Sequence, residues 1–344
     1  MATEALRPDL PQNIDRRFWG YIFRRAGRRF LTNHGFDIAA TLSFFAVLSL
    51  FPALIALVSL IGLLGRSDAA VDALLDAFEV VAPGGVIEII AGALDYFSQT
   101  TTVGFGLVVG VSVAVWISSR YVTAFSRAIN RVYGVREGRP FWKLKPLQLL
   151  ITAIAVLLLL IVAVVLLISG PIADVIGDLL GIGETSQAIW SIAQWPILAF
   201  AAISMVALLY YATPNVKQPK FRWMGMGAAV ALLIIATASV GQAVYLRNFP
   251  NLDLTYGSVA GILIFLLWIW FANIALIFGA HINTEVERVR QLQVGIPAEE
   301  EVHLFPRDTR STRRLDKRRE KNVATARAMR KRAAALRGTD DQTS

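Results

Sequence analysis

Six long apolar stretches dominate the pattern of hydrophobic and polar positions along the chain. None of them contains an acidic or basic side chain other than histidine, and each exceeds the roughly 20 residues that an α-helix needs to cross a bilayer. They cover residues 38–65, 96–119, 146–173, 185–216, 223–246 and 254–284. The pattern predicts an all-α, polytopic membrane protein with six transmembrane helices within residues 38–284.

The segment between the first two stretches follows a different pattern. Val71, Leu74 and Phe78 recur at helical spacing, and acidic residues occupy the other faces. Pro83 interrupts this pattern, which resumes at Val86. We therefore expect an amphipathic helical cap at about residues 67–101, on the outer face of the membrane, which either packs on the spans or acts as a gate.

Basic residues are concentrated in alternate connections. The segments 1–37, 120–145, 217–222 and 285–344 together hold 32 of the 34 lysines and arginines. Because the cytoplasmic loops of membrane proteins are enriched in these residues, the distribution predicts that both termini are cytoplasmic, as an even number of spans requires. The chain would then have a basic N-terminal segment (1–37) and a basic C-terminal tail (285–344), the latter partly disordered.

The composition agrees with a membrane protein and excludes several chemistries. Hydrophobic residues make up 55% and charged residues 17% of the chain, and the mean hydropathy is +0.54 although the net charge is +9. Soluble domains average about 25% charged residues, so the values fit neither an ordinary soluble enzyme nor a disordered chain. The absence of cysteine excludes disulfides, thiol catalysis, iron–sulfur clusters and cysteine zinc sites.

Side chains that could carry catalysis are sparse in the sequence. The three histidines, His34, His281 and His303, are not at metal-ligand spacing. The sequence also has no phosphate-binding glycine loop and no serine nucleophile motif. We therefore predict a non-enzymatic protein with no catalytic residue, no metal ligand and no cofactor.

Polar residues inside the spans form the first candidate site, because a polar side chain within a membrane is by default a functional candidate. The candidates for a substrate path or a polar core are Ser43, Ser49 and Pro52 in the first span, Gln242 and Tyr245 in the fifth, and Asn273, His281 and Asn283 in the sixth. Plainer interpretations stay open: a packed kink at Pro52, hydrogen bonds between helices at Gln242 and Asn273, and a structural histidine instead of a proton relay at His281.

A second candidate site follows the second span. Arg120, Arg127 and Arg131 are separated by seven and four residues, so they share one helix face at the membrane surface. They either anchor the span on its basic side or contact the anionic head groups of lipids. The basic tail has similar alternatives, anionic lipid or solvent. Specific nucleic-acid binding is not expected, because the basic part of the tail lacks aromatic residues for base stacking.

Three blocks of residues carry a family resemblance. The first block runs from Ala39 to Pro52. The second comprises Trp116 to Arg120, Asn130 to Tyr133, and Phe141. The third comprises Tyr210-Tyr211, Pro214-Asn215, Tyr245, Tyr256-Gly257-Ser258, Trp268 and Gly279 to Asn283. On these residues the chain resembles the YihY/virulence factor BrkB family over roughly residues 20–290.

The resemblance implies a six-span helical protein of the bacterial cytoplasmic (inner) membrane. The family carries the historical label ribonuclease BN, a tRNA-processing enzyme. Some members are linked to serum resistance, and others have been proposed to move lipid or lipopolysaccharide precursors. The family pattern often has a glutamate after Gly-Ala near the end of the sixth span, where this chain has His281.

Three functions stay open at the level of the sequence. The leading hypothesis is a protein that assists transport or transbilayer movement of a lipid or another amphiphile. One alternative is a membrane scaffold whose basic tail recruits a partner, and the less favoured one is the tRNA-processing ribonuclease. The expected partners are the lipid bilayer and its anionic lipids, and the small residues in the spans allow a homo-oligomer.

Overall fold

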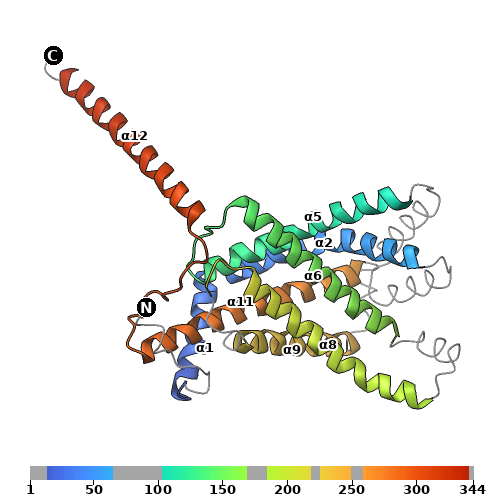
Figure 1. The fold of residues 1–344 in the computed structure, drawn as a ribbon. Helices are drawn as coiled ribbons and strands as arrows, with labels where there is room; N and C mark the ends of the chain where they lie inside the picture. The colour runs from blue at the N-terminus through green and yellow to red at the C-terminus, as the bar shows by residue number, and fades with distance from the viewer. Residues whose placement is uncertain (1–13, 65–102, 169–183, 218–224, 249–258, 341–344) are drawn as a thin grey trace.

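The computed structural model describes residues 14–64, 103–168, 184–217, 225–248 and 259–340, and the regular elements in these ranges are all helices (Figure 1). They are α1 (Arg17–Thr32), α2 (Gly35–Leu64), α5 (Val103–Val132), α6 (Phe141–Ile168), α8 (Glu184–Ala212), α9 (Gly225–Asn248), α11 (Val259–Gln293) and α12 (Arg310–Asp340). The predicted all-α class is therefore confirmed for the described residues.

Six of these helices, from α2 to α11, overlap the six apolar stretches of the sequence. Four contain a segment long and apolar enough to cross a membrane, namely Phe141–Val162, Ile192–Ala212, Gly225–Asn248 and Leu263–Gln293. A shorter apolar segment, Gly35–Ser49, begins α2. The number of spans and the sides of the termini stay predictions, and the expected cap at about 67–101 lies outside the described residues.

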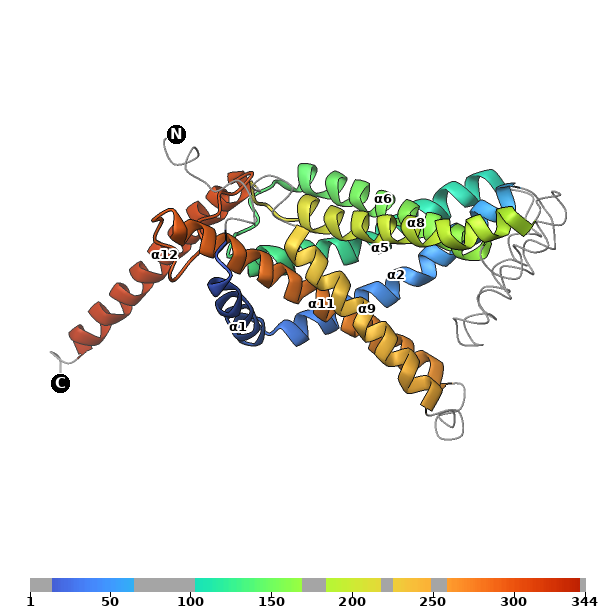
Figure 2. The same ribbon diagram turned by 90° about the horizontal axis from the view of Figure 1, so that it is seen from below.

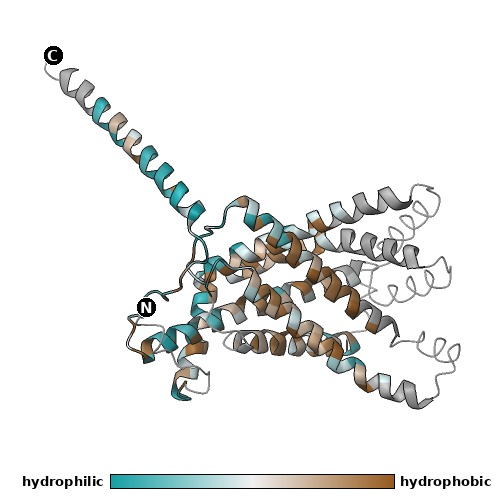
Figure 3. Cartoon of the chain, viewed as in Figure 1, coloured by the Kyte–Doolittle hydropathy of each residue, from teal (hydrophilic) through white to brown (hydrophobic). Residues whose placement is uncertain are grey.

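The surface of the bundle is apolar where a soluble protein would be polar. Leu157, Phe200 and Leu233 are each more than half exposed on α6, α8 and α9. Figure 3 shows hydrophobic residues along the middle of the long helices and hydrophilic residues gathered where α1 and α12 lie; we call this the polar end of the bundle. Contiguous exposed apolar surface of this kind suits a bundle surrounded by lipid.

Helix α11 lies at the centre of the packing and contacts α1, α2, α5 and α9. In the core beside it, the ring of Tyr210 from α8 stacks on Phe125 of α5, with ring centroids 6.2 Å apart. The Tyr210 hydroxyl also donates a hydrogen bond to the carbonyl of Leu276. One buried aromatic side chain thus joins α5, α8 and α11, and its polar atom is paired inside the bundle as burial requires.

A sharp turn joins α1 to the long helix α2. His34 adopts the left-handed conformation, with a φ of 57°, and its backbone N–H donates to the carbonyl of Leu31 over 3.1 Å. Histidine is among the residues that tolerate this conformation. The turn sends α1 across the ends of the long helices rather than along them, as Figures 1 and 2 show.

The chain folds back onto the bundle after α11. The guanidinium of Arg288 donates to the carbonyl of Ala298, and the backbone N–H of His303 donates to Gln291 over 2.9 Å. An isolated antiparallel bridge then pairs Val216 with Pro306. Residues 294–309 are therefore a packed strap, and in the described part of the predicted tail (285–344) it is α12 that projects from the bundle.

Candidate functional site

A cavity of about 400 Å³ lies among five of the long helices, and its wall is almost entirely apolar. The lining residues include Ala46 and Ser49 of α2, Ser118, Tyr121 and Val122 of α5, Thr152 and Ala155 of α6, Met205 and Leu209 of α8, and Trp268, Ala272 and Asn273 of α11. In Figure 2, α6 and α8 diverge from α9 with distance from the polar end. The lining residues place the cavity among α2, α5, α6, α8 and α11.

One polar contact crosses this wall and joins three helices. The Tyr121 hydroxyl of α5 donates to Oδ1 of Asn273 over 3.0 Å, and Nδ2 of Asn273 donates to Ser43 Oγ of α2 over 3.3 Å. Nδ2 also donates to the carbonyl of Ile269 over 2.9 Å within α11. Ser43 and Asn273 are both buried. Two predicted residues that are 230 positions apart therefore meet beside the cavity.

The serine and threonine hydroxyl groups at the cavity wall lie within hydrogen-bond distance of backbone carbonyls. Ser49 Oγ donates to Phe45 over 2.7 Å, and Thr152 Oγ1 donates to Gln148 over 2.8 Å, each four residues back on its own helix. Ser118 Oγ lies 3.5 Å from the carbonyl of Ser49 on the neighbouring helix. Because these donors are used, the wall suits a hydrocarbon chain better than an ion or a sugar.

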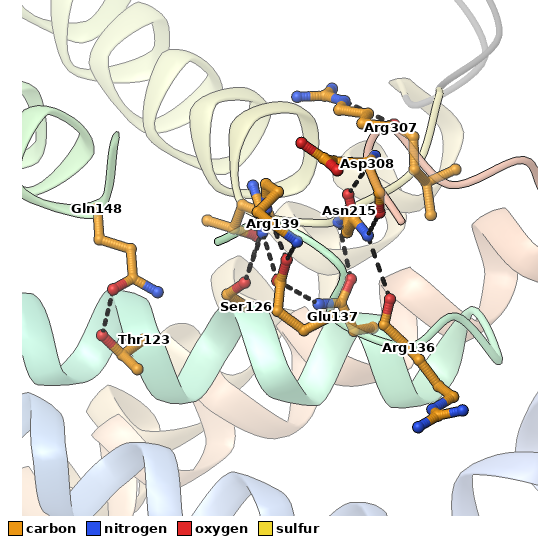
Figure 4. A network of polar contacts seen from close by, with 12 residues as sticks. Thr123, Ser126, Arg136, Glu137, Arg139, Gln148, Asn215, Arg307 and Asp308 are labelled. Atoms are coloured by element: carbon orange, nitrogen blue, oxygen red, sulfur yellow. Dashed lines mark hydrogen bonds and ion pairs between the residues drawn. The ribbon is translucent and has the colours of Figure 1, made fainter. Parts of the chain in front are cut away.

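A dense polar network at the polar end ties the connection after α5 to the end of α8 (Figure 4). The buried Arg139 donates to both carboxylate oxygens of Glu137, over 2.8 and 2.7 Å, and to the carbonyl of Thr213 over 2.7 Å. Asn130 also donates to Glu137, over 3.0 Å. Glu137 and Arg139 are not among the site residues that the sequence predicted. Glu137 could have been singled out, because it is the single acidic residue in the basic connection 120–145.

The strap enters this network through Asn215. The Asn215 amide donates to the carbonyls of Arg136 and Asp308, over 3.1 and 2.8 Å, and its backbone N–H donates to Asn130 Oδ1 over 2.8 Å. Arg307 donates to the carbonyl of Val216 over 2.7 Å. Asn130 and Asn215 both belong to the blocks that carry the family resemblance, and the structure shows that they connect three segments of the chain.

A second charged cluster lies between α1 and the end of α11. The fully buried Glu285 accepts a hydrogen bond from Arg288 Nε over 2.9 Å. Its carboxylate also lies 3.2 Å from Arg25 Nε and 3.6 Å from Arg29 Nε. Since one carboxylate faces three guanidinium groups, this cluster has an excess of positive charge.

Four other predicted residues of the spans do not line the cavity. Asn283 accepts a hydrogen bond from the backbone N–H of Gly227, over 2.8 Å, and Gln242 donates to the carbonyl of Ile264 over 3.0 Å, so both join α9 to α11. Tyr245 is half exposed on α9. His281 is fully buried with its ring edge-on to Phe30, and its nitrogens have no hydrogen-bond partner within the described ranges. Pro52 lies within α2, where its side chain is outside the described part.

The three arginines of the predicted stripe are exposed on α5. Arg120, Arg127 and Arg131 lie on one continuous helix, which extends 13 residues beyond the apolar stretch that ended at residue 119. Lys145 of α6 adds a cation at the Arg120 end of this stripe, with its ammonium 2.7 Å from Ser119 Oγ and 4.3 Å from the centre of the Trp116 ring.

The chain is similar in sequence to one protein family and to several curated proteins. A family model described as Virulence factor BrkB matches residues 26–303. The chain is 27% identical over 265 residues to the ribonuclease-like protein YfkH of Bacillus subtilis, which covers 77% of this chain and 94% of YfkH. It is 29% identical over 281 residues to a UPF0761 membrane protein of Rhodospirillum centenum, covering 78% of this chain and 58% of that relative. No solved structure matches the chain significantly.

Proposed function

Because the chain belongs to the virulence factor BrkB family of membrane proteins, we propose that it is a non-enzymatic protein that assists the transbilayer movement of a lipid or another amphiphile. The observation that carries this proposal is the apolar cavity of about 400 Å³ within the bundle. A hydrocarbon chain can enter such a cavity without losing hydrogen bonds, whereas a polar substrate would lose its hydration without replacement.

The exposed basic face of α5 supports a role for the lipid head group. Ser118 and Tyr121 line the cavity, and the intervening Arg120 is exposed on the same helix. In this proposal the acyl chain lies in the cavity and the anionic head group meets Arg120 first, while Arg127 and Arg131 continue the basic face about two and three turns farther along α5. In this proposal the polar end and both termini face the cytoplasm from a bacterial inner membrane, as the distribution of basic residues predicts.

The test is lipid movement by the full chain reconstituted in liposomes, followed as quencher accessibility of a head-group-labelled phospholipid. We expect equilibration between leaflets to be faster than in protein-free vesicles. Ala155→Phe should slow it several-fold, because the new ring fills the cavity. The matched control is Ala153→Phe, which places the same ring on the exposed face of α6. Unaccelerated equilibration by folded protein, or equal rates for the two variants, would count against the proposal.

A membrane scaffold is the second candidate function, and the projecting helix α12 favours it. From Arg318 onward the described side chains of α12 are exposed on every face, and basic residues recur along its length. A helix that is polar all round does not need the bundle for burial, so it is available to a partner. The ribonuclease activity suggested by the name of YfkH is less favoured, because no metal-binding cluster of acidic or histidine side chains occurs among the described residues.

A further inference from the structure

Helix α1 carries four rows of side chains, each with a different environment. Residues four apart share one side of a helix, so the sequence of α1 divides into the rows Ile22-Ala26-Phe30, Phe23-Gly27-Leu31, Gly20-Arg24-Arg28 and Tyr21-Arg25-Arg29. The first row is buried against α11. The position of this row fixes the directions in which the other three rows point.

The Arg25 row faces the strap beyond the end of α11. Arg25 donates to the carbonyl of Glu299 over 2.7 Å, and Arg29 donates to that of Glu300 over 2.8 Å. Arg25 also donates to the Tyr21 hydroxyl over 2.9 Å. Together with the ion pairs to Glu285, these contacts hold two guanidinium groups in place at the polar end.

The Phe23 row lies on the opposite side of α1, toward the apolar body of the bundle. Phe23 is 43% exposed and Leu31 is 61% exposed. Phe36, just past the turn, is also exposed and packs against Trp270 of α11, with ring centroids 5.9 Å apart. Exposed apolar side chains that point along the long helices, from a helix lying across their ends, are typical of a helix in the membrane interface.

The Arg24 row points away from the bundle and borders a groove of about 260 Å³. The groove is lined by Tyr21, Arg24, Arg25, Arg28, Arg29 and Thr32. Within the described ranges, neither Arg24 nor Arg28 makes an ion pair. The carboxylate of Glu285 faces Arg25, Arg29 and Arg288 instead. Four guanidinium groups therefore line the groove, and those of Arg24 and Arg28 are exposed.

We propose that α1 is an interfacial helix that places Phe23 and Leu31 at the boundary of the acyl chains and binds the phosphate of an anionic phospholipid between Arg24 and Arg28. Guanidinium groups match phosphate oxygens with paired hydrogen bonds, and the anchored Arg25 and Arg29 add positive charge without having to be ordered on binding. This site goes beyond the proposed function, because it binds a resident lipid whether or not the protein moves lipids.

The test uses the absence of cysteine from the chain. Gly20→Cys places one thiol in the Arg24 row, where an added side chain meets no other atom within 4 Å. The full-length variant carries a fluorophore there and is reconstituted in phosphatidylcholine nanodiscs. A minor fraction of phosphatidylglycerol or phosphatidylcholine bears a nitroxide at the same shallow acyl position. We expect stronger quenching by the labelled phosphatidylglycerol.

Two double variants of the labelled Gly20→Cys protein test whether Arg24 and Arg28 bind the phosphate. Arg24→Gln with Arg28→Gln should lower the preference for phosphatidylglycerol several-fold, with roughly 30-fold as the upper bound for two basic residues at a membrane surface. Arg318→Gln with Arg319→Gln removes the same charge from the exposed part of α12 and should leave the preference unchanged. Equal quenching by the two lipids in the parent protein, or equal loss in both double variants, would overturn the proposal.

Discussion

At the scale of single residues, Asn273 joins three helices within an apolar bundle. Its amide accepts from Tyr121 and donates to Ser43, so α2, α5 and α11 share one set of hydrogen bonds beside the cavity. Hydrogen bonds between membrane helices are worth about 0.6 kcal/mol on average and up to roughly 1.7 kcal/mol. The contact is therefore expected to fix the geometry of the cavity wall as well as to add modest stability.

Asn273→Ala should lower the free energy of unfolding by about 1–2 kcal/mol, because it removes both interhelical bonds and leaves the buried Tyr121 hydroxyl without its partner. The measurement is unfolding of the detergent-solubilised protein by a denaturing detergent. Thr237→Val is the control, since the exposed Thr237 hydroxyl donates to the carbonyl of Leu233 on its own helix. Equal effects of the two changes would show that the Asn273 contact adds no stability.

Asp308 gives the polar end a dependence on pH. The backbone N–H of Arg310, which donates to the Asp308 carboxylate over 2.9 Å, lowers the pKa of that carboxyl, and the side chains of Arg310 and Lys143 act in the same direction. A lowered pKa means that the carboxylate stabilises the fold above its ordinary titration range. This contribution is lost as the pH falls through the lowered pKa.

Asp308→Asn should therefore reproduce at neutral pH what strong acid does to the native chain. We expect faster amide hydrogen exchange in the first turn of α12, because an uncharged side chain accepts the Arg310 N–H less strongly at a helix N-terminus. Exchange rates at neutral pH, read by mass spectrometry, would show this. Glu320→Gln, farther along α12 and exposed, should leave that first turn protected.

At the scale of elements, the pairing of α9 with α11 depends on two facing glycines. A Cβ on Gly227 would clash with the carbonyl oxygen of Gly279, and a Cβ on Gly279 would clash with that of Gly227. Small residues at such crossings let helix backbones approach closely in a membrane. The close approach also allows Asn283 to accept the Gly227 N–H.

Gly227→Ala should therefore destabilise the protein by about 1–3 kcal/mol, the usual cost of inserting atoms into a packed core. Gly241→Ala is made on the same helix, where the added Cβ meets nothing within 4 Å, and it should be neutral or stabilising by up to about 1 kcal/mol. Thermal unfolding of the two variants in the same detergent makes the comparison. If Gly227→Ala leaves the thermal stability unchanged, α9 can shift on α11 without loss of stability, and the prediction is wrong.

At the scale of the whole molecule, the strap of residues 294–309 closes the polar end. It contacts the end of α11 through Arg288 and Gln291, and the end of α8 through Asn215 and Val216. Helix α12 begins only after these contacts, so the strap belongs to the bundle rather than to a free tail. The first turns of α12 also contact the connection after α5, through Ser311, Thr312 and Asp316. A truncation that tests the tail must therefore spare residues up to 316.

Removing residues 317–344 should leave the fold and the movement of lipid nearly unchanged, whereas removing 299–344 should cost several kcal/mol, at about 1 kcal/mol for each lost hydrogen bond. Thermal unfolding and the liposome assay on both truncations measure these effects. If the shorter truncation keeps stability but abolishes the cellular function, the scaffold role of α12 is favoured over the movement of lipid by the bundle.

The sequence by itself determined the class of the protein and the approximate positions of its long helices. Uncharged apolar stretches of this length bury their backbone polar groups only as helices in a membrane, so all-α structure followed from local composition. The residue at which a helix ends could not be predicted as well from the sequence. Helix α5 continues past Ser119 through the arginine stripe to Val132, because polar residues do not stop a helix once its end leaves the apolar region.

Only the tertiary structure decided which polar residues meet. Ser43 and Asn273 are both visible as polar residues in spans, but their pairing across 230 positions depends on how α2 and α11 pack. The contacts of Glu285 with Arg25 and Arg29 likewise depend on the turn at His34 that lays α1 across the bundle. Local patterns fix helices because their hydrogen bonds are local, whereas a cavity, a strap and a charged groove come from contacts between distant segments.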